Sequence, residues 1–448
     1  MTRSSSHRFL IAVLRLLVIL SVVVALGGVL SLRVRGQTER PAVRVAYVQQ
    51  GNIWVLDARG RRTRLTRDGH DAAPRWTTGG QALLFQRQLR SRIETLRWQP
   101  GKGIRQLRDG LWSPDASAVA MVRVGSHAQS ATTVWVARHG QAVRITPLEP
   151  AFRWYPLAWS PNSRRLALSR FAISPPTKPG QEMPPTSASL WVTIGAGART
   201  HLKRLPLPPV SRGHPGWPDI VFWSPRGRFL TVGVGPNTPC GSCRADGRPY
   251  YAISTTSGTV VPLGTALGPD ETISWAADDS YVVLSIPAGR ETYENKHLVR
   301  VDPITGMRRS LSHDAHWADI EPAVSPGGSL IAFARGHVLR TPDVSTVALI
   351  ASRHLFLMGA HAARPHRLMN APGWTDQAPV WSADGRWLLF VRWRRHEQGQ
   401  AAAAALWAVR ADGSNAQRLA RLDLPEGFLN GFGYYGAFGW QGLFAVAP

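Results

Sequence analysis

Leu111-Trp112-Ser113-Pro114-Asp115 is one copy of a pattern that returns as Ala158-Trp159-Ser160-Pro161-Asn162 and as Phe222-Trp223-Ser224-Pro225-Arg226. Weaker copies are centred on Trp76, Trp275, Val324 and Trp381. An apolar run follows each of these copies. A turn of the Pro-Asp-Gly type suits a tight antiparallel hairpin, so the run is expected to be a strand that pairs with the one before the turn. The pattern therefore predicts a pair of β-strands that is repeated along the chain.

Two further strands complete each predicted repeat. The third carries a central aromatic residue, as in Ile53-Trp54-Val55 and Val134-Trp135-Val136. The fourth is short and ends in an aliphatic or small polar residue, as in Arg64-Leu65-Thr66 and Gln417-Arg418-Leu419. Four strands in a period of roughly fifty residues are typical of one blade of a β-propeller.

This repeat resembles that of the TolB-like, WD40-like (PD40-type) β-propeller family, from about Val43 to the C-terminus. The resemblance implies an all-β fold, a single propeller of four-stranded blades, and protein contacts at the cell envelope. It does not specify a ligand. Val324, which stands where most copies have Trp, departs from the pattern and leaves the alignment of single blades open.

The two ends of the repeat region look like parts of one blade. Val43 to Thr66 reads as a third and a fourth strand, and Gly436 to Val446 reads as the missing first pair. Seven internal copies plus this shared blade predict eight blades, with seven as the nearest alternative, and closure of the ring would leave only short sheet edges.

The N-terminus predicts membrane targeting. A short basic tail, residues 1–8, precedes an apolar segment, residues 9–32, that is long enough for a transmembrane signal anchor or a signal peptide. A linker, residues 33–42, leads to the propeller, residues 43–448. The positive-inside rule places the propeller outside the cytoplasm, either membrane-anchored or secreted if the signal is cleaved.

Charge and cysteine content limit the partners. Lys and Arg number 53 against 28 for Asp and Glu, a formal net charge of +25, which favours an anionic polymer or lipid surface. The basic residues are scattered, however, and that pattern also fits background composition on a solvated surface.

Cys240 and Cys243 form a lone CxxC in a loop, for which a disulfide is the expected state outside the cytoplasm.

Binding residues are expected on the face that holds the loops after the second and fourth strands, where the long insertions fall. The recurring Asp71, Asp219, Asp319 and Asp376 on this face are expected to cap loop amides as part of the scaffold. Residues that interrupt the repeat are the candidate binding residues: His214, Trp217, His316, Trp317, Trp374, Arg392, Trp393, Arg394 and Arg395.

Catalysis is not indicated by any motif. The sequence contains no GxSxG elbow, HExxH or GxxxxGK[ST] loop, and His313 to Asp319 lack the tight spacing of a metal site. We therefore predict no catalytic residue, metal or cofactor, and we predict a binding or scaffold module for a protein, a peptide or an anionic envelope polymer; nucleic acid is not favoured. The alternatives are a glycosidase or lyase with carboxylates at the channel mouth, and the outer domain of a membrane sensor.

Overall fold

The computed structural model describes residues 39–125, 131–173, 186–195, 200–209, 216–236, 246–268, 272–338, 346–361, 364–395, 401–424 and 439–448. The predicted tail and anchor, His214, Cys240 and Cys243 lie outside these residues. No helix within the described ranges is both long and apolar enough to cross a bilayer. Residues Ala42–Pro448 form one compact unit, which is described below by itself.

The described strands of this unit form six four-stranded antiparallel sheets and one eight-stranded sheet. The larger sheet is two four-stranded groups, C and D, joined where Thr132 of β10 pairs with Arg153 of β12. The first four groups are A, with β32 (Phe444–Val446), β1 (Val45–Gln49), β2 (Asn52–Leu56) and β3 (Arg62–Arg64); B, with β4 (Asp71–Trp76), β5 (Leu83–Gln88), β6 (Ile93–Gln99) and β7 (Gly103–Gln106); C, with β8 (Leu111–Trp112), β9 (Ala118–Val124), β10 (Thr132–Arg138) and β11 (Gln141–Arg144); and D, with β12 (Phe152–Trp159), β13 (Leu166–Ala172), β14 (Ser187–Ile194) and β15 (His201–Leu205).

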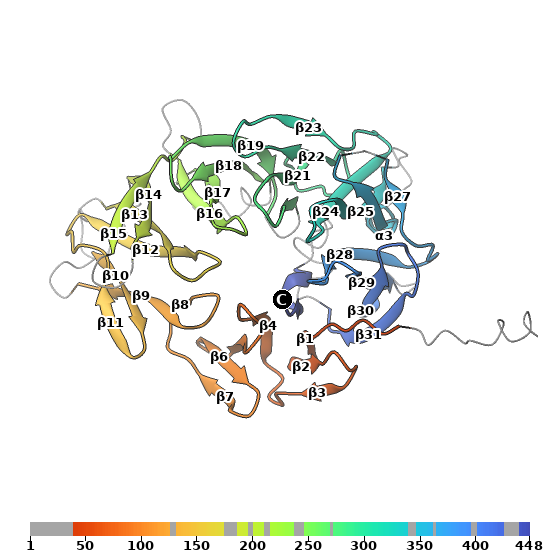
Figure 1. Ribbon diagram of the computed structural model, residues 1–448, viewed down its shortest axis with the longest axis horizontal. Helices are drawn as coiled ribbons and strands as arrows, with labels where there is room; N and C mark the ends of the chain where they lie inside the picture. The colour runs from red at the N-terminus through yellow and green to blue at the C-terminus, as the bar shows by residue number, and fades with distance from the viewer. Residues whose placement is uncertain are drawn as a thin grey trace, which may run out of the picture. The chain divides into compact units, whose positions relative to one another are not determined.

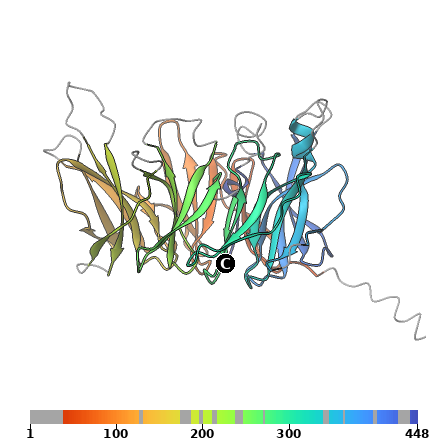
Figure 2. The same ribbon diagram turned by 90° about the horizontal axis from the view of Figure 1, so that it is seen from above.

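The other four groups follow the same order. They are E, with β16 (Trp217–Trp223), β17 (Phe229–Gly235), β18 (Arg248–Ser254) and β19 (Val260–Ala266); F, with β20 (Ile273–Trp275), β21 (Val282–Ile286), β22 (His297–Val301) and β23 (Arg308–Ser310); G, with β24 (Trp317–Val324), β25 (Leu330–His337), β26 (His354–Gly359) and β27 (His366–Arg367); and H, with β28 (Thr375–Trp381), β29 (Trp387–Arg395), β30 (Ala401–Arg410) and β31 (Gln417–Leu422). The sheets follow one another around a ring, with the first strand of each innermost and the fourth outermost (Figure 1). A short helix, α3 (Thr346–Ala351), lies on one face of the ring (Figure 2).

The repeated motif ends the first strand of each sheet from B to H. In all of these sheets except F, which has Ala276 at this position, a hydroxyl closes the turn that follows: the Ser113 side chain accepts a hydrogen bond from the amide of Ala118 at 3.0 Å, and Ser382 accepts one from Trp387 at 3.0 Å. Thr77, Ser160, Ser224 and Ser325 accept the amide five residues later in the same way. The hydroxyl thus fixes the hairpin between the first and second strands.

The motif tryptophans of sheets B, D, E and H join neighbouring sheets, whereas Trp112 of sheet C donates to Arg108 just before its own strand. The indole nitrogen of Trp159 donates to the carbonyl oxygen of Leu111 in the preceding sheet at 2.8 Å. The same bond joins Trp76 to Ala445, Trp223 to Ala158 and Trp381 to Ala323. Where Val324 replaces the tryptophan, its backbone amide instead donates to Ser274 of the preceding sheet at 3.0 Å. The repeat therefore encodes the contact between sheets as well as the sheets themselves.

Sheet A contains both ends of the ring, but the division of its strands differs from the prediction. Tyr47 pairs with Phe444 and Val45 pairs with Val446 in an antiparallel ladder. The N-terminal segment supplies three strands, not two, because Val45–Gln49 is itself a strand that turns tightly into the next one at Gly51, where φ is +61°. The C-terminal segment therefore supplies one strand, not a pair.

The hydrophobic core lies between adjacent sheets. Val283 and Leu298 of sheet F pack with Ile331 and Phe333 of sheet G, for example, and all four side chains are fully buried. Each sheet buries both faces in this way, so the side chains that remain for binding lie at the strand ends and along the outermost strands.

Candidate functional site

Buried arginine–aspartate pairs recur where the first strands begin. Three pairs have the same spacing of 16 residues and link the first strand to the second: Asp71 with Arg87, Asp319 with Arg335, and Asp376 with Arg392. In the last pair both carboxylate oxygens of Asp376 accept hydrogen bonds, at 2.6 and 3.0 Å. Sheet E has a variant in which Asp219 pairs with Arg248 of the third strand.

The expected structural role of these aspartates stays a prediction, but the structure provides them with partners other than the expected loop amides. Asp319 and Asp376 are almost fully buried, and so are the arginines that bind them. Because a buried carboxylate needs a partner of opposite charge and several hydrogen bonds, the two-pronged guanidinium is a suitable one. These side chains hold the first and second strands together near the start of the first strand, on the face of the ring where the long loops lie.

A β-bulge follows the aspartate in each of the three pairs that have the 16-residue spacing. Ala73, Glu321 and Ala378 stand two residues after them with φ values of 51°, 55° and 51°, and the strand register shifts there. A bulge leaves one residue outside the regular ladder and turns its polar groups in a new direction. At Ala378 the backbone amide points to the neighbouring sheet and donates to the Glu321 carboxylate at 2.7 Å.

Glu321 lies at the centre of a buried polar group between sheets G and H. Burial raises the pKa of Glu321, whereas Arg353 and the amide of Ala378 act in the opposite direction. Arg353 is also almost fully buried and donates to Thr292, in the loop between β21 and β22 of sheet F, at 2.6 Å. These contacts run across three sheets, so the group is well placed to fix the angles between them.

Lys296 is a second buried cation on this side of the ring. Its ammonium group donates to the carbonyl oxygens of Pro287 and Gly289 at 3.1 and 2.8 Å. Burial lowers the pKa of Lys296 to about 8, and the charges of Glu291 and Glu294 oppose that change. The side chain closes the loop between β21 and β22.

Two aromatic pairs lie beside the paired charges, one in sheet G and one in sheet H; Arg335 itself lies 5.4 Å from the Trp317 ring. Trp317 packs against His337 with 3.9 Å between ring centroids, and the Arg394 guanidinium lies 5.4 Å from the Trp374 ring. His337 and Arg394 are exposed, and both tryptophans are half-buried. Desolvation lowers the pKa of His337, with the charges of His354 and Arg367 contributing. We refer to Trp317, His337, Trp374 and Arg394 as the aromatic surface.

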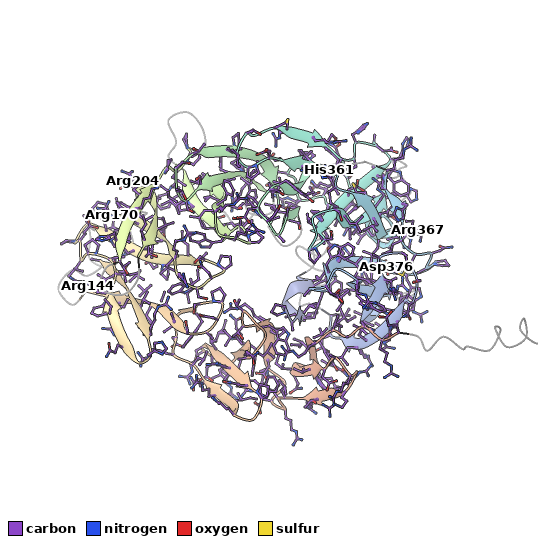
Figure 3. All side chains as sticks on the ribbon, in the orientation of Figure 1. Arg144, Arg170, Arg204, His361, Arg367 and Asp376 are labelled. Carbon is purple, nitrogen blue, oxygen red and sulfur yellow. The ribbon has the colours of Figure 1, made fainter. Side chains whose placement is uncertain are left out.

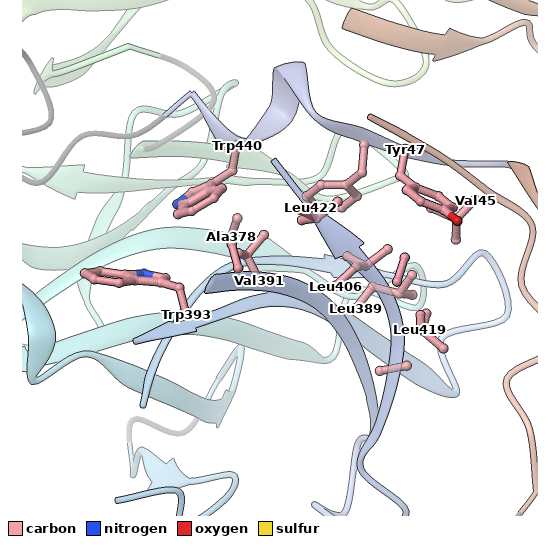
Figure 4. Close-up of a cluster of buried hydrophobic side chains, with 14 of the residues drawn as sticks. Val45, Tyr47, Ala378, Leu389, Val391, Trp393, Leu406, Leu419, Leu422 and Trp440 are labelled. Atoms are coloured by element: carbon pink, nitrogen blue, oxygen red, sulfur yellow. The ribbon is translucent and has the colours of Figure 1, made fainter. Parts of the chain in front are cut away.

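The structure brings some of the sequence-predicted residues to this surface and places others in the interior. Arg392 is buried against Asp376, and Trp393 is 1% exposed and donates to Gln377 at 2.8 Å. Trp393 belongs to the same buried cluster as Trp440 and Ala378 (Figure 4). His316, whose ring nitrogen lies 2.9 Å from Asp314, is exposed beside Trp317.

The remaining predicted residues lie elsewhere. Trp217 is buried in sheet E and stacks on Phe171 of sheet D, with 4.9 Å between the rings. Arg395 ends β29, and its side chain is outside the described part, as is all of His214.

The three tryptophans belong to the repeat and do not interrupt it. Trp217, Trp317 and Trp374 each stand two residues before the paired aspartate of their sheet. The signal was present in the sequence as Trp-x-Asp, but it is visible only when the copies are aligned on the aspartate. Sequence reasoning also missed His337, which faces Trp317 across the β24–β25 ladder.

A pocket of about 670 Å³ opens near the motif turns at the inner edge of sheets A, B and H. Trp76, Trp381 and Phe444 line it together with Arg75. Its described lining side chains include no Asp or Glu. The pocket therefore offers an apolar wall with one cation, not a pair of acidic groups.

Comparison with known proteins shows the fold and not a family. No protein-family profile matches the chain, and no curated protein matches its sequence. Dipeptidyl peptidase 4 of Porphyromonas gingivalis is similar in structure, with a TM-score of 0.52 and 13% identity over 86% of this chain and 60% of that one. A TolB-type protein of Agrobacterium tumefaciens matches over 85% of this chain and 90% of its own with 12% identity and a TM-score of 0.33.

Oligogalacturonate lyase of Vibrio parahaemolyticus matches over 68% of this chain and 73% of its own, with 12% identity and a TM-score of 0.37. These neighbours have propeller domains, and the likeness to the peptidase supports a propeller-like fold for this chain. The chain spans about three fifths of the length of that peptidase.

Proposed function

We propose that the protein is an eight-bladed β-propeller that serves as a binding module, with sheets A to H as its blades. Residues 9–32 would hold it at a membrane with the propeller outside the cytoplasm, as the basic tail and apolar segment predict. The aromatic surface of sheets G and H would bind an extended segment of a partner protein or a peptide.

The observation that carries this proposal is the contrast between two sets of side chains at the site. The carboxylates of Asp319 and Asp376 are occupied by arginines and withdrawn from solvent. The rings of Trp317 and Trp374, by contrast, are partly exposed next to an exposed histidine and an exposed arginine. Aromatic and arginine side chains on a rigid support are the residues that dominate protein–protein binding energy.

The alternative of a glycosidase or lyase is less well supported. Such chemistry needs two acidic groups that reach a substrate, one of which serves as the acid. The carboxylates at this end of the inner strands are engaged by arginines, or, for Glu321, enclosed between two sheets. Hydrolysis or elimination of a polysaccharide by the purified chain would favour the enzyme alternative.

A peptide-binding assay tests the proposal. The full-length chain in neutral detergent is titrated into fluorescent members of an unstructured peptide library, and anisotropy is recorded. For the peptides that bind, Trp374→Ala with Arg394→Ser should weaken affinity about tenfold or more, because loss of a hot spot costs about 1.4 kcal/mol or more.

The matched control is a similar pair on another sheet. Arg123 lies 4.2 Å over the ring of Trp135, and it too is exposed while the tryptophan is half-buried. Trp135→Ala with Arg123→Ser should leave affinity within about twofold of the wild type. Equal losses in both double variants, or no loss in either, would refute the assignment of the site to sheets G and H.

A further inference from the structure

The outermost strands of the ring carry a single sign of charge. Seven of the eight fourth strands contain arginine, and none of the eight contains Asp or Glu. The arginines are Arg62 and Arg64 in β3, Arg105 in β7, Arg144 in β11, Arg204 in β15, Arg308 and Arg309 in β23, Arg367 in β27, and Arg418 and Arg421 in β31. We refer to these ten residues as the basic rim.

These arginines are exposed, and no ion pair among the described residues joins any of them to a carboxylate. Three arginines of the second strands, Arg87, Arg335 and Arg392, bind aspartate instead. The hydrogen-bond acceptors of Arg62, Arg64 and Arg308 are backbone carbonyls, and Arg64 also lies over the Trp54 ring. The positive charge of the rim is therefore not neutralised locally.

Protection of the sheet edges explains part of this pattern. A charged residue on an outer strand discourages edge-to-edge pairing with another sheet, but either sign of charge serves that purpose. Sheet E shows that the fold also has another solution, because its outer strand β19 has no charge and contains Pro262, which cannot donate a ladder hydrogen bond. Edge protection alone does not account for one sign of charge in all seven other sheets.

We propose that the basic rim binds a flexible linear polymer that carries a phosphate group in each repeating unit. Arginine forms paired hydrogen bonds with phosphate, and a row of exposed arginines concentrates such a chain by releasing its counterions. Arg144 and Arg204 lie on one side of the ring and Arg367 on the opposite side (Figure 3). A flexible chain can follow this curved edge, whereas a flat bilayer touches one side of it at a time. This inference does not depend on the peptide-binding proposal.

Binding of long-chain inorganic polyphosphate to the full-length protein in neutral detergent tests the inference over a series of salt concentrations. The rim variant combines Arg105→Ser, Arg144→Ser, Arg204→Ser and Arg309→Ser, four exposed positions on different fourth strands. The control variant combines Arg90→Ser, Arg108→Ser, Arg164→Ser and Arg226→Ser, which are exposed arginines outside the fourth strands. Both variants lose four charges, so net charge is matched.

We expect the wild type to bind polyphosphate with an affinity that falls steeply with salt. The rim variant should bind at least about tenfold more weakly with a shallower salt dependence, and the control should stay within about threefold of the wild type. Equal weakening in both variants would overturn the inference, because the effect would then be one of net charge. It would also be overturned if the wild type bound vesicles of anionic lipid but not polyphosphate.

Discussion

The pair of Asp376 and Arg392 provides the strongest test of how the repeat stabilises the ring. Both side chains are buried, the carboxylate has no exposed surface, and two hydrogen bonds of 2.6 and 3.0 Å join them. Asp376→Ala leaves the arginine charge buried without its partner. Breaking a buried pair from one side costs about 3 to 5 kcal/mol, and we expect the free energy of unfolding to fall by that amount.

The second arm of the experiment removes both charges. Asp376→Leu with Arg392→Met replaces the pair by apolar side chains, so that no charge is left buried, and stability should return to within about 2 kcal/mol of the wild type. Arg61→Ala is the control, because it breaks an ion pair with Asp57 in which the guanidinium is largely exposed, and this variant should unfold at the wild-type denaturant concentration.

Urea unfolding followed by tryptophan fluorescence and by circular dichroism measures all of these variants. Agreement between the two probes would show that the unfolding transition can be treated as one step. If Asp376→Ala were as stable as the wild type, the pair would not support the fold, and Asp376 would have to be reconsidered as a functional carboxylate. If the double variant were as unstable as Asp376→Ala, lost packing and not an unpaired charge would be the cause.

Three further predictions concern the contacts within and between sheets. Trp159→Phe removes the hydrogen bond to Leu111 in the neighbouring sheet and should lower the free energy of unfolding, measured by urea unfolding, by about 1 kcal/mol, because the partly buried carbonyl loses its donor. No change would contradict the role of the motif indole. Lys296 has a folded pKa of about 8, below its ordinary value of 10.5, so its contribution to stability is present above pH 10.5 and is lost as the pH falls through 8. Lys296→Met should remove about 3 kcal/mol of that pH dependence, and identical stability profiles for variant and wild type would refute the lowered pKa. Glu321 has a raised pKa in the folded state, so its contribution to stability is fully present below pH 4.5, its ordinary pKa, and is lost as the pH rises above that value. Glu321→Gln should flatten this fall in stability. An unchanged profile of stability against pH would contradict the burial of a charge between sheets G and H.

The sequence predicted the parts of the fold that depend on local chemistry. Trp112, Trp159 and Trp223 mark the ends of first strands, as the turn-forming residues after them indicated. The contribution of the chain ends to one sheet was also expected, but Val45–Gln49 was not recognised as a strand of its own because only the turn at Gly51 separates it from the next strand.

The candidate site was harder to predict because its chemistry depends on pairing across strands and sheets. Arg392 and Arg394 lie on the same side of β29, because alternate residues of a strand share a face, yet Arg392 is buried against Asp376 and Arg394 is exposed. Trp393 between them is buried on the opposite side, so the period of the strand alone does not separate the buried residues from the exposed one. The regular spacing of 16 residues from each aspartate to its arginine was available in the sequence. The bond from Ala378 to Glu321 was not, because it joins two sheets.

The central structural claim is that the two ends of the described unit close one ring, on which both proposed binding surfaces depend. In a chain with Cys240→Ser and Cys243→Ser, we would introduce Val45→Cys with Val446→Cys and measure disulfide formation by the change in gel mobility before and after reduction. These two residues face each other in the β1–β32 ladder, at a position between hydrogen-bonded pairs, where side chains lie closest. The closed ring predicts rapid, nearly complete disulfide formation between positions 45 and 446. The control, Val45→Cys with Ala447→Cys, is one residue out of register and should form little disulfide. Equal disulfide formation in the two variants, or none between positions 45 and 446, would contradict the closed ring.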